Sequence, residues 1–191
     1  MSRLRVAGLV IVLVAAASCG ATALAAARER IDGTVVHVAD GDSFVLRSVG
    51  TGGRARLTRV RIVAIDAPEA AQPHHRSAGA LLRSMIWRRA VSVDGAAHDR
   101  YGRLAATVSV GGRDAGLAMV QSGLAWYAPA HASELRSVDR GLYRDAEAAA
   151  RLAHVGLWAD AEPVPPWQYR RDHPRGRWSA AHSRRMLRPL H

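Results

Sequence analysis

Short segments rich in β-branched and aliphatic residues recur between residues 34 and 110, and the first of them alternates between apolar and polar positions. The turn Ala39-Asp-Gly-Asp42 joins the first two segments, and Asp-Gly between two such runs is a strong hairpin signal. Pro68 ends the third segment, because proline cannot continue a strand ladder. We therefore expect five strands, at Thr34–Val38, Ser43–Arg47, Arg56–Ile65, Ala90–Val93 and Leu104–Val110.

Helices are expected in three places. Apolar residues at steps of three and four predict an amphipathic helix over Arg76–Arg89. A short helix is expected over Asp114–Gly123, closed by its glycine, and a longer one begins at Ser133 as N-cap and runs to Val155. The apolar face expected for this last helix consists of Leu135, Val138, Leu142, Ala149 and Leu152.

Five short strands with a helix between the third and the fourth form the pattern of the OB-fold, a partly open Greek-key barrel. The sequence therefore predicts an α+β protein that is mainly β, with a five-stranded OB-fold barrel and three α-helices packed against it. We assign this domain to residues 28–160. Residues 161–191 are predicted to form a basic tail rich in proline and arginine.

Residues 1–27 resemble a targeting segment. Arg3 and Arg5 precede an apolar stretch from Val6 to Ala17, and Ala23-Leu24-Ala25 fits a signal-peptide cleavage site. An uncleaved membrane anchor is an alternative, since the apolar run continues to residue 27, and so is a lipoprotein modified at Cys19. All three alternatives predict export, either as a secreted or periplasmic protein or as one anchored in a membrane.

The net positive charge of the chain indicates the kind of partner it binds. The formal net charge is +11, from 27 basic and 16 acidic residues, and every basic residue is arginine. Such a chain favours a polyanion, either nucleic acid or an anionic membrane surface. Cys19 is the only cysteine, so a chain cleaved after Ala25 can form neither a disulfide nor a cysteine-based zinc site.

Candidate chemistry lies in three clusters at strand ends. The first is Asp40-Gly-Asp42, the second combines Arg61 with Asp66 and Glu69, and the third is Asp99-Arg-Tyr-Gly-Arg103. Each cluster alone is compatible with an ordinary turn or charged loop. Their order along the predicted strands makes the combination far more specific than any one of them.

The sequence resembles the staphylococcal nuclease (thermonuclease) family from about Asp32 to Trp158. The segments that carry this resemblance are Asp40-Gly-Asp-Ser43, Val60-Arg-Ile-Val-Ala-Ile-Asp-Ala-Pro-Glu69, Asp99-Arg-Tyr-Gly-Arg103, Gly123-Leu-Ala-Trp126 and Gly156-Leu-Trp158. The resemblance implies that Asp42, Asp66 and the backbone carbonyl of Ala67 bind one Ca²⁺. Calcium takes six to eight oxygen ligands, so a site with so few from the protein is open to water and phosphate.

The resemblance also implies the roles of the remaining candidate residues. Glu69 is the expected general base for the attacking water, and Arg61 and Arg103 are expected to hold the scissile phosphate and stabilise its developing charge. Tyr101 is expected to contact substrate. Ser43 stands where the family usually has threonine, and its hydroxyl is expected to support the site.

The function implied is hydrolysis of DNA and RNA with little sequence preference, leaving 3′-phosphate ends, with single-stranded substrate preferred. The alternative is a non-catalytic OB-fold module that binds nucleic acid. Pro129 and His131 stand near positions where further tyrosines are expected to stack on bases, which leaves that platform in question. A monomer is the expected state, and the N-terminal segment is a candidate for membrane association.

Overall fold

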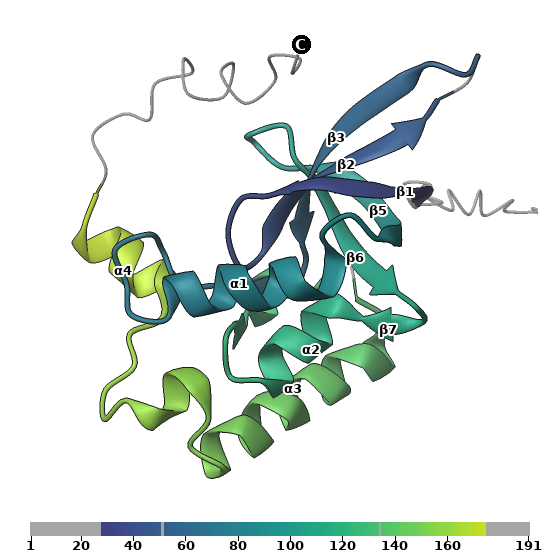
Figure 1. Ribbon diagram of the computed structural model, residues 1–191. Coiled ribbons are helices and arrows are strands. Elements are labelled where there is room, and N and C mark those ends of the chain that lie inside the picture. Colours follow the sequence, from purple (N-terminus) through teal and green to yellow (C-terminus); the bar gives the residue numbers. More distant parts are fainter. Residues whose placement is uncertain (1–27, 51, 134, 175–191) are drawn as a thin grey trace, which may run out of the picture.

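A closed barrel of five strands forms the centre of the molecule (Figure 1). The computed structural model describes residues 28–50, 52–133 and 135–174, so the predicted targeting segment and the end of the basic tail lie outside the described residues. The barrel strands are β1 (Glu29–Val38), β2 (Ser43–Val49), β3 (Ala55–Ile62), β5 (Ala90–His98) and β6 (Leu104–Val110).

The strand order closes the barrel and confirms the predicted OB-fold. Neighbouring strands pair antiparallel in the order β3-β2-β1-β5-β6, and β3 then pairs with β6 in parallel through Val60–Ile62. Two short pairings lie outside this ring: β7 (Arg113–Asp114) extends β6, and β4 (Ile65–Asp66) pairs with β8 (Trp126–Tyr127). The β4–β8 pair fixes the chain that leaves β3 against the second half of the domain.

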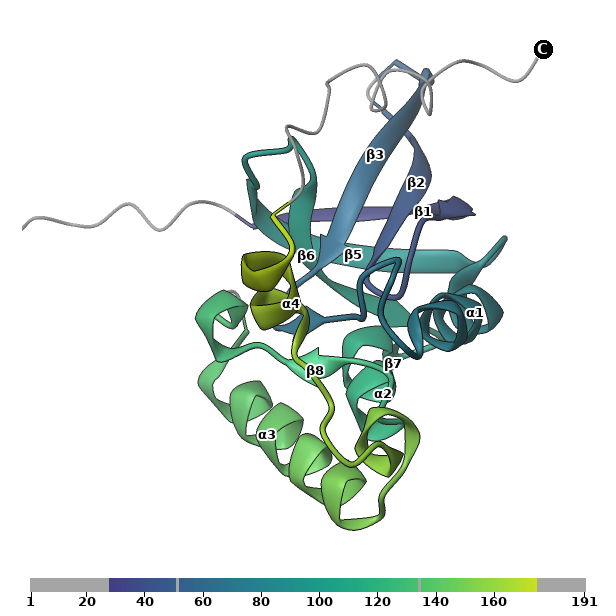
Figure 2. The same ribbon diagram turned by 90° about the vertical axis from the view of Figure 1, so that its left-hand side faces the viewer.

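Four α-helices accompany the barrel: α1 (His75–Ile86), α2 (Ala115–Gln121), α3 (Ser137–Leu152) and α4 (Pro166–Asp172). Figure 1 shows α1, α2 and α3 together at one end of the barrel. The fourth helix lies apart from them, on the side of the molecule where β4 and β8 pair (Figure 2). None of the helices in the described part of the chain has the length and apolar character needed to cross a bilayer.

The barrel interior and the facing sides of α1 and α2 form one hydrophobic core. Its largest fully buried side chains include Phe44, Leu46, Ile62, Ile65, Leu82, Ile86, Leu104, Met119 and Tyr143. A second, smaller cluster joins Trp126, Ala150, Leu157 and Trp158, with the half-buried Trp167 of α4 packed against it. The C-terminal helix is therefore attached to the domain by apolar contact.

The third strand is shorter than predicted. It ends at Ile62, and the chain turns at Ala64, which has a φ of 61°. Backbone hydrogen bonds hold this turn, because the N–H of Ala64 donates to the carbonyl of His131 and the N–H of Ala128 donates to the carbonyl of Ala64. The turn aims the following residues, Ile65 and Asp66, at β8 instead of along the barrel.

The predicted apolar face of the third helix is wrong. The helix begins at Ser137 with Arg136 as N-cap, so Ser133 does not cap it. Its buried residues are Tyr143 and Ala150, whereas the exposed fractions of Val138, Leu142 and Leu152 are 65%, 52% and 84%. Among the residues assigned to that face, Leu135 is buried, but it precedes the helix.

A single carboxylate connects α2 to α3. Asp114 caps α2 by accepting from the N–H groups of Gly116 and Leu117, and both of its oxygens accept from the hydroxyl of Tyr143 at 2.9 Å. The fit is tight, because a Cβ at Gly116 would lie 2.6 Å from that hydroxyl oxygen. Asp114 therefore satisfies a helix end and a buried phenol at once.

Replacing this carboxylate should weaken the domain. We expect Asp114→Ala to lower the free energy of unfolding by about 2–4 kcal/mol, because it removes a helix cap and the acceptor of a buried hydroxyl. Asp145→Ala is the matched control, since Asp145 pairs with Arg144 on the open surface, and we expect a change within about 0.5 kcal/mol. Urea denaturation of the variants measures both values, and equal stabilities would contradict the proposed role of Asp114.

Candidate active site

The candidate residues meet at one rim of the barrel, where β2 begins and β3 ends. Ser43 of β2 is the register partner of Arg61 in β3, which places Asp42 beside that arginine. The N–H of Ile62 donates to the carbonyl of Asp42 at 2.9 Å and ties the turn before β2 to the end of β3.

A glycine lets the chain after β4 approach this rim. A Cβ added at Gly41 would lie 2.7 Å from the Cβ atoms of both Ala67 and Ala78. Because the turn packs so closely, the N–H of Ala67 donates to Asp42 Oδ2 at 2.9 Å. The Asp-Gly-Asp turn thus does more than join two strands. Its glycine leaves the space that allows Asp42 to lie next to the Asp66-Ala67 segment.

Arg61 forms ion pairs with both aspartates. Its guanidinium contacts Asp42 Oδ2, and its Nη2 lies 2.9 Å from Asp66 Oδ1. The exposed fractions of the side chains are 5% for Asp42, 2% for Asp66 and 17% for Arg61. Two carboxylates that water hardly reaches are therefore held together by one buried cation.

The protonation state of Asp42 follows from this pairing. Burial alone would raise its pKa, but the charge and hydrogen bond of Arg61, with hydrogen bonds from Ala67 and Ser43, lower the pKa to about 2. Asp42 is therefore ionised at neutral pH. Burial and the charge of Asp42 raise the pKa of the neighbouring Asp40 to about 7. Burial would lower the pKa of Arg61, yet Asp42 and Asp66 raise it above its usual value, so it stays charged.

Arg103 joins the same network through a hydroxyl. Its Nη1 donates to Ser43 Oγ at 3.1 Å, and Ser43 Oγ donates to Asp42 Oδ1 at 2.8 Å. Asp99 orients the arginine by accepting from its Nε at 2.7 Å, and it also accepts from the backbone N–H of Tyr101. The loop sequence Asp99-Arg-Tyr-Gly-Arg103 thus aims one guanidinium at the rim of the barrel.

Tyr101 is the exposed aromatic side chain of this rim, with 53% of its surface accessible. The guanidinium carbons of Arg100 and Arg103 lie 4.9 and 5.4 Å from its ring centroid. Its backbone carbonyl accepts from Arg59 Nη2. An accessible ring flanked by cations is a suitable contact for a nucleotide base or phosphate.

Glu69 reaches the network through an arginine that the sequence analysis missed. Arg170 Nη1 lies 2.8 Å from Glu69 Oε1, and Arg170 Nη2 lies 2.7 Å from Asp66 Oδ2. The predicted basic tail thus contains α4, which returns to the site. Pro165-Pro166 before Trp167 is a signal for a helix start, but no sequence pattern indicates that Arg170 contacts residues about a hundred positions away.

The donor set fits a calcium ion. The carboxylates of Asp42 and Asp66 share Arg61, the Glu69 carboxylate is linked to Asp66 by Arg170, and Ala67 lies beside Asp42. Hard oxygen donors of this kind are what Ca²⁺ prefers. Within the described residues, no three His, Cys, Asp or Glu side chains are grouped so that they could hold a metal ion together.

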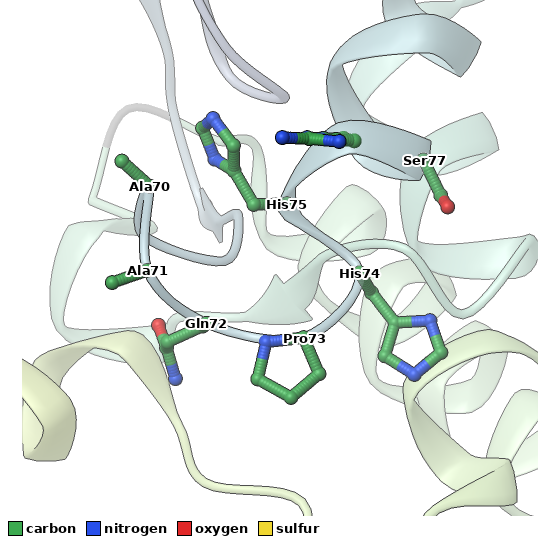
Figure 3. A pocket seen from close by; sticks show the side chains of 8 residues that line it. Ala70, Ala71, Gln72, Pro73, His74, His75 and Ser77 are labelled. Atoms are coloured by element: carbon green, nitrogen blue, oxygen red, sulfur yellow. The ribbon is translucent and has the colours of Figure 1, made fainter.

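The loop between β4 and α1 lines a shallow hollow beside the site. Figure 3 shows Gln72, Pro73, His74 and His75 around it. Hydrogen bonds hold this loop in place: His75 Nδ1 lies 2.8 Å from the carbonyl of Pro68, and His74 Nε2 lies 3.2 Å from Asp160 Oδ2. Asp42, Asp66 and Glu69 do not line this hollow.

The segment after β8 provides little exposed aromatic surface. Trp126 is buried, with 6% of its surface accessible, as expected of a core residue. The ring of Tyr127 is half-buried and lies 6.0 Å from that of Tyr143. Pro129 and His131 belong to a 3-10 helix whose last carbonyl is bonded to Ala64. The ring of Tyr101 is therefore more exposed than those of Trp126 and Tyr127.

Comparison with known proteins places the chain in a family. The model of the staphylococcal nuclease homologues matches residues 59–160. The chain is 39% identical to Protein ParB of Escherichia coli over 73% of this chain and 79% of that protein. It is 34% identical to an uncharacterized endonuclease of Escherichia coli O157:H7 (73% and 85%) and 32% identical to a micrococcal nuclease of Shigella flexneri (73% and 80%). The chain therefore belongs to the staphylococcal nuclease family.

Proposed function

We propose that this protein is a calcium-dependent endonuclease that hydrolyses phosphodiester bonds of DNA and RNA with little sequence preference. One observation carries the proposal: two buried carboxylates, a third carboxylate and three guanidinium groups form one continuous network at the barrel rim. It runs from Arg103 through Ser43, Asp42, Arg61 and Asp66 to Arg170 and Glu69. Family membership and relatives named as nucleases support the same function.

The carboxylates supply the metal site and the base. Asp42, Asp66 and the carbonyl of Ala67 would hold Ca²⁺, which when bound polarises the phosphate and helps to neutralise its charge. Glu69 accepts a proton from the attacking water. Its side chain is 17% exposed, so it is accessible from solvent yet close to the buried aspartates.

The arginines supply the phosphate site. As water adds to phosphorus, negative charge grows on the phosphate oxygens, and the guanidinium groups of Arg61 and Arg103 stabilise it. The bond from phosphorus to the 5′ oxygen breaks, that oxygen takes up a proton, and the phosphate stays on the 3′ end. Arg103 is 27% exposed and Arg61 17%, so both retain access to a substrate at the rim.

The same geometry favours single-stranded substrate. Contacts to phosphate and stacking on a base carry no sequence information, so little sequence preference is expected. The phosphate has to approach carboxylates that are almost fully buried, and a flexible strand reaches such a site more easily than a duplex. Monomeric protein suffices for this chemistry, because every residue of the site comes from one chain.

Calcium dependence is the first test. Purified protein should cut single-stranded DNA, duplex DNA and RNA with CaCl₂, fastest for the single strand, and should stop with EGTA. The products should carry 3′-phosphates and 5′-hydroxyls, so that they can be ligated only after the 3′-phosphates are removed and the 5′-hydroxyls are phosphorylated. Binding of the same oligonucleotides without any calcium-dependent cleavage would contradict the enzyme and support the alternative, a non-catalytic binding module.

Substitutions of Arg103 and Arg61 should differ in their effect on stability. Arg103→Ala should lower turnover by about 10²–10³-fold with a small loss of stability, since its side chain is partly exposed. Arg61→Gln should lower turnover and also the free energy of unfolding, by about 3–5 kcal/mol, because it leaves the buried Asp42 without its cation and Asp66 with only the partly exposed Arg170. Initial rates of cleavage with CaCl₂ measure turnover, and urea denaturation in EGTA measures the free energy of unfolding.

Two exposed arginines serve as controls for these variants. The controls are Arg113→Ala and Arg47→Gln. Arg113 lies on β7, at the opposite end of β6 from Arg103, and Arg47 lies on the outer side of β2. Each removes one positive charge, and stability should change by no more than about 0.5 kcal/mol. A loss of turnover as large in Arg113→Ala as in Arg103→Ala would show that net charge, and not the rim, controls the rate.

We also propose that the protein is exported, as a secreted or periplasmic enzyme or one held at a membrane. The support is the sequence of residues 1–27. Expression in a bacterial host and intact-mass measurement of the envelope and medium fractions should find a chain that begins at Ala26. A full-length mass in the membrane fraction would favour the anchor instead, and full-length protein confined to the cytoplasm would contradict export.

A further inference from the structure

The C-terminal helix α4 is attached to the active-site rim by three different contacts. Trp167 packs edge-on against Trp126 with ring centroids 5.7 Å apart. Gln72, in the loop that follows Glu69, donates through Nε2 to the carbonyl of Val164 at 2.8 Å. Arg170 forms ion pairs with Asp66 and Glu69. Helix α4 is thus fixed both to the core and to the loop that carries Glu69.

Arg170 takes up oxygens that a cation would need. Asp66 Oδ2 accepts from Arg170 Nη2 at 2.7 Å, and Asp66 Oδ1 accepts from Arg61 Nη2 at 2.9 Å and from Arg170 Nη1 at 3.2 Å. Glu69 Oε1 accepts from Arg170 Nη1. A guanidinium so placed competes with a metal ion in two ways, because it uses the oxygen lone pairs and repels a second positive charge.

The two arginines on Asp66 differ in accessibility. The side chain of Arg61 is 17% exposed and lies beneath the carboxylates in β3, whereas that of Arg170 is 42% exposed and lies on a short surface helix. Removing Arg61 from the carboxylates would disturb the barrel. Removing Arg170 requires only that a helix of seven residues, with the segment before it, swing away from Trp126 and Gln72.

We propose that Arg170 is an internal competitor for the cation and that α4 is a displaceable cover of the active site. This inference rests on the proposed function and adds regulation of the same site. Calcium and Arg170 exclude one another at Asp66 and Glu69, so calcium binds tightly only when α4 has moved. A nucleic-acid strand favours that movement, since a phosphate offers the guanidinium two oxygens in the geometry that a carboxylate offers.

Calcium titration of the protein without nucleic acid tests the competition. Calorimetry with CaCl₂ should show that Arg170→Ala binds calcium about 5–10-fold more tightly than the parent, at the low end of coupling between sites because Arg170 is partly exposed. Arg171→Ala is the matched control. It removes the same charge from the neighbouring exposed position of α4 and should leave the affinity unchanged within twofold.

Hydrogen exchange separates displacement from a simple effect of charge. In the parent protein, calcium should speed exchange of the backbone amides of residues 167–173. In Arg170→Ala these amides should already exchange fast without calcium, because only the contact of Trp167 and the hydrogen bond from Gln72 to Val164 would hold the helix. Unchanged exchange on adding saturating calcium to the parent would overturn the displacement of α4.

Cleavage assays distinguish failure of this inference from failure of the proposed function. Arg170→Ala should cut single-stranded DNA faster than the parent at low calcium and at a similar rate at saturating calcium. Slower cleavage by Arg170→Ala than by the parent at low calcium would overturn competition. Equal calcium affinities in two active proteins would also overturn it. If neither protein bound calcium nor cut DNA, the proposed function itself would fail.

Discussion

The ion pairs of Arg61 with Asp42 and Asp66 are the constraint on which the site depends. Two carboxylates with exposed fractions of 5% and 2% lie side by side here, and burying such charges without a cation beside them is costly. Arginine is suited to this place, because its guanidinium stays charged when buried and can donate to two carboxylates at once. The pairing explains why the carboxylates meet at the rim of a barrel strand, where β3 supplies the cation and water is still near enough for chemistry.

Much of the barrel and of the rim could be predicted from the sequence, because local chemistry specifies both. Asp-Gly-Asp determines a turn, and a glycine at position 41 is the residue that allows Ala67 to approach, whereas β3 ends before Pro68, at Ile62. Residues fixed by such turns lie at strand ends. In a closed barrel, the ends of neighbouring strands lie close together at the same rim. The roles assigned to individual residues remain predictions, but their convergence on one rim follows from the turns themselves.

The third and fourth helices show where sequence patterns fail. Apolar spacing favoured Val138, Leu142 and Leu152, yet α3 packs through Tyr143, whose hydroxyl needs Asp114, and through the small Ala150. A polar partner and close packing decided the orientation, and neither is visible in periodicity. The contact of Arg170 with Asp66 spans 104 positions of the chain. In a chain whose 27 basic residues are all arginine, nothing local distinguishes the arginine that makes this contact.

The charges at the rim are compatible with two different arginines at one site: Arg61, which is fixed in β3, and Arg170, which we propose to be displaceable. Asp42, Asp66 and Glu69 carry three negative charges, and Arg61 neutralises only part of them from below. Under the proposed competition, the remaining negative potential would attract either a metal ion or the Arg170 guanidinium. A phosphate would change the balance, because it adds negative charge that both cations can share. Such a site would bind a metal ion best when substrate is present, since the substrate would provide the competitor with another anion to pair with.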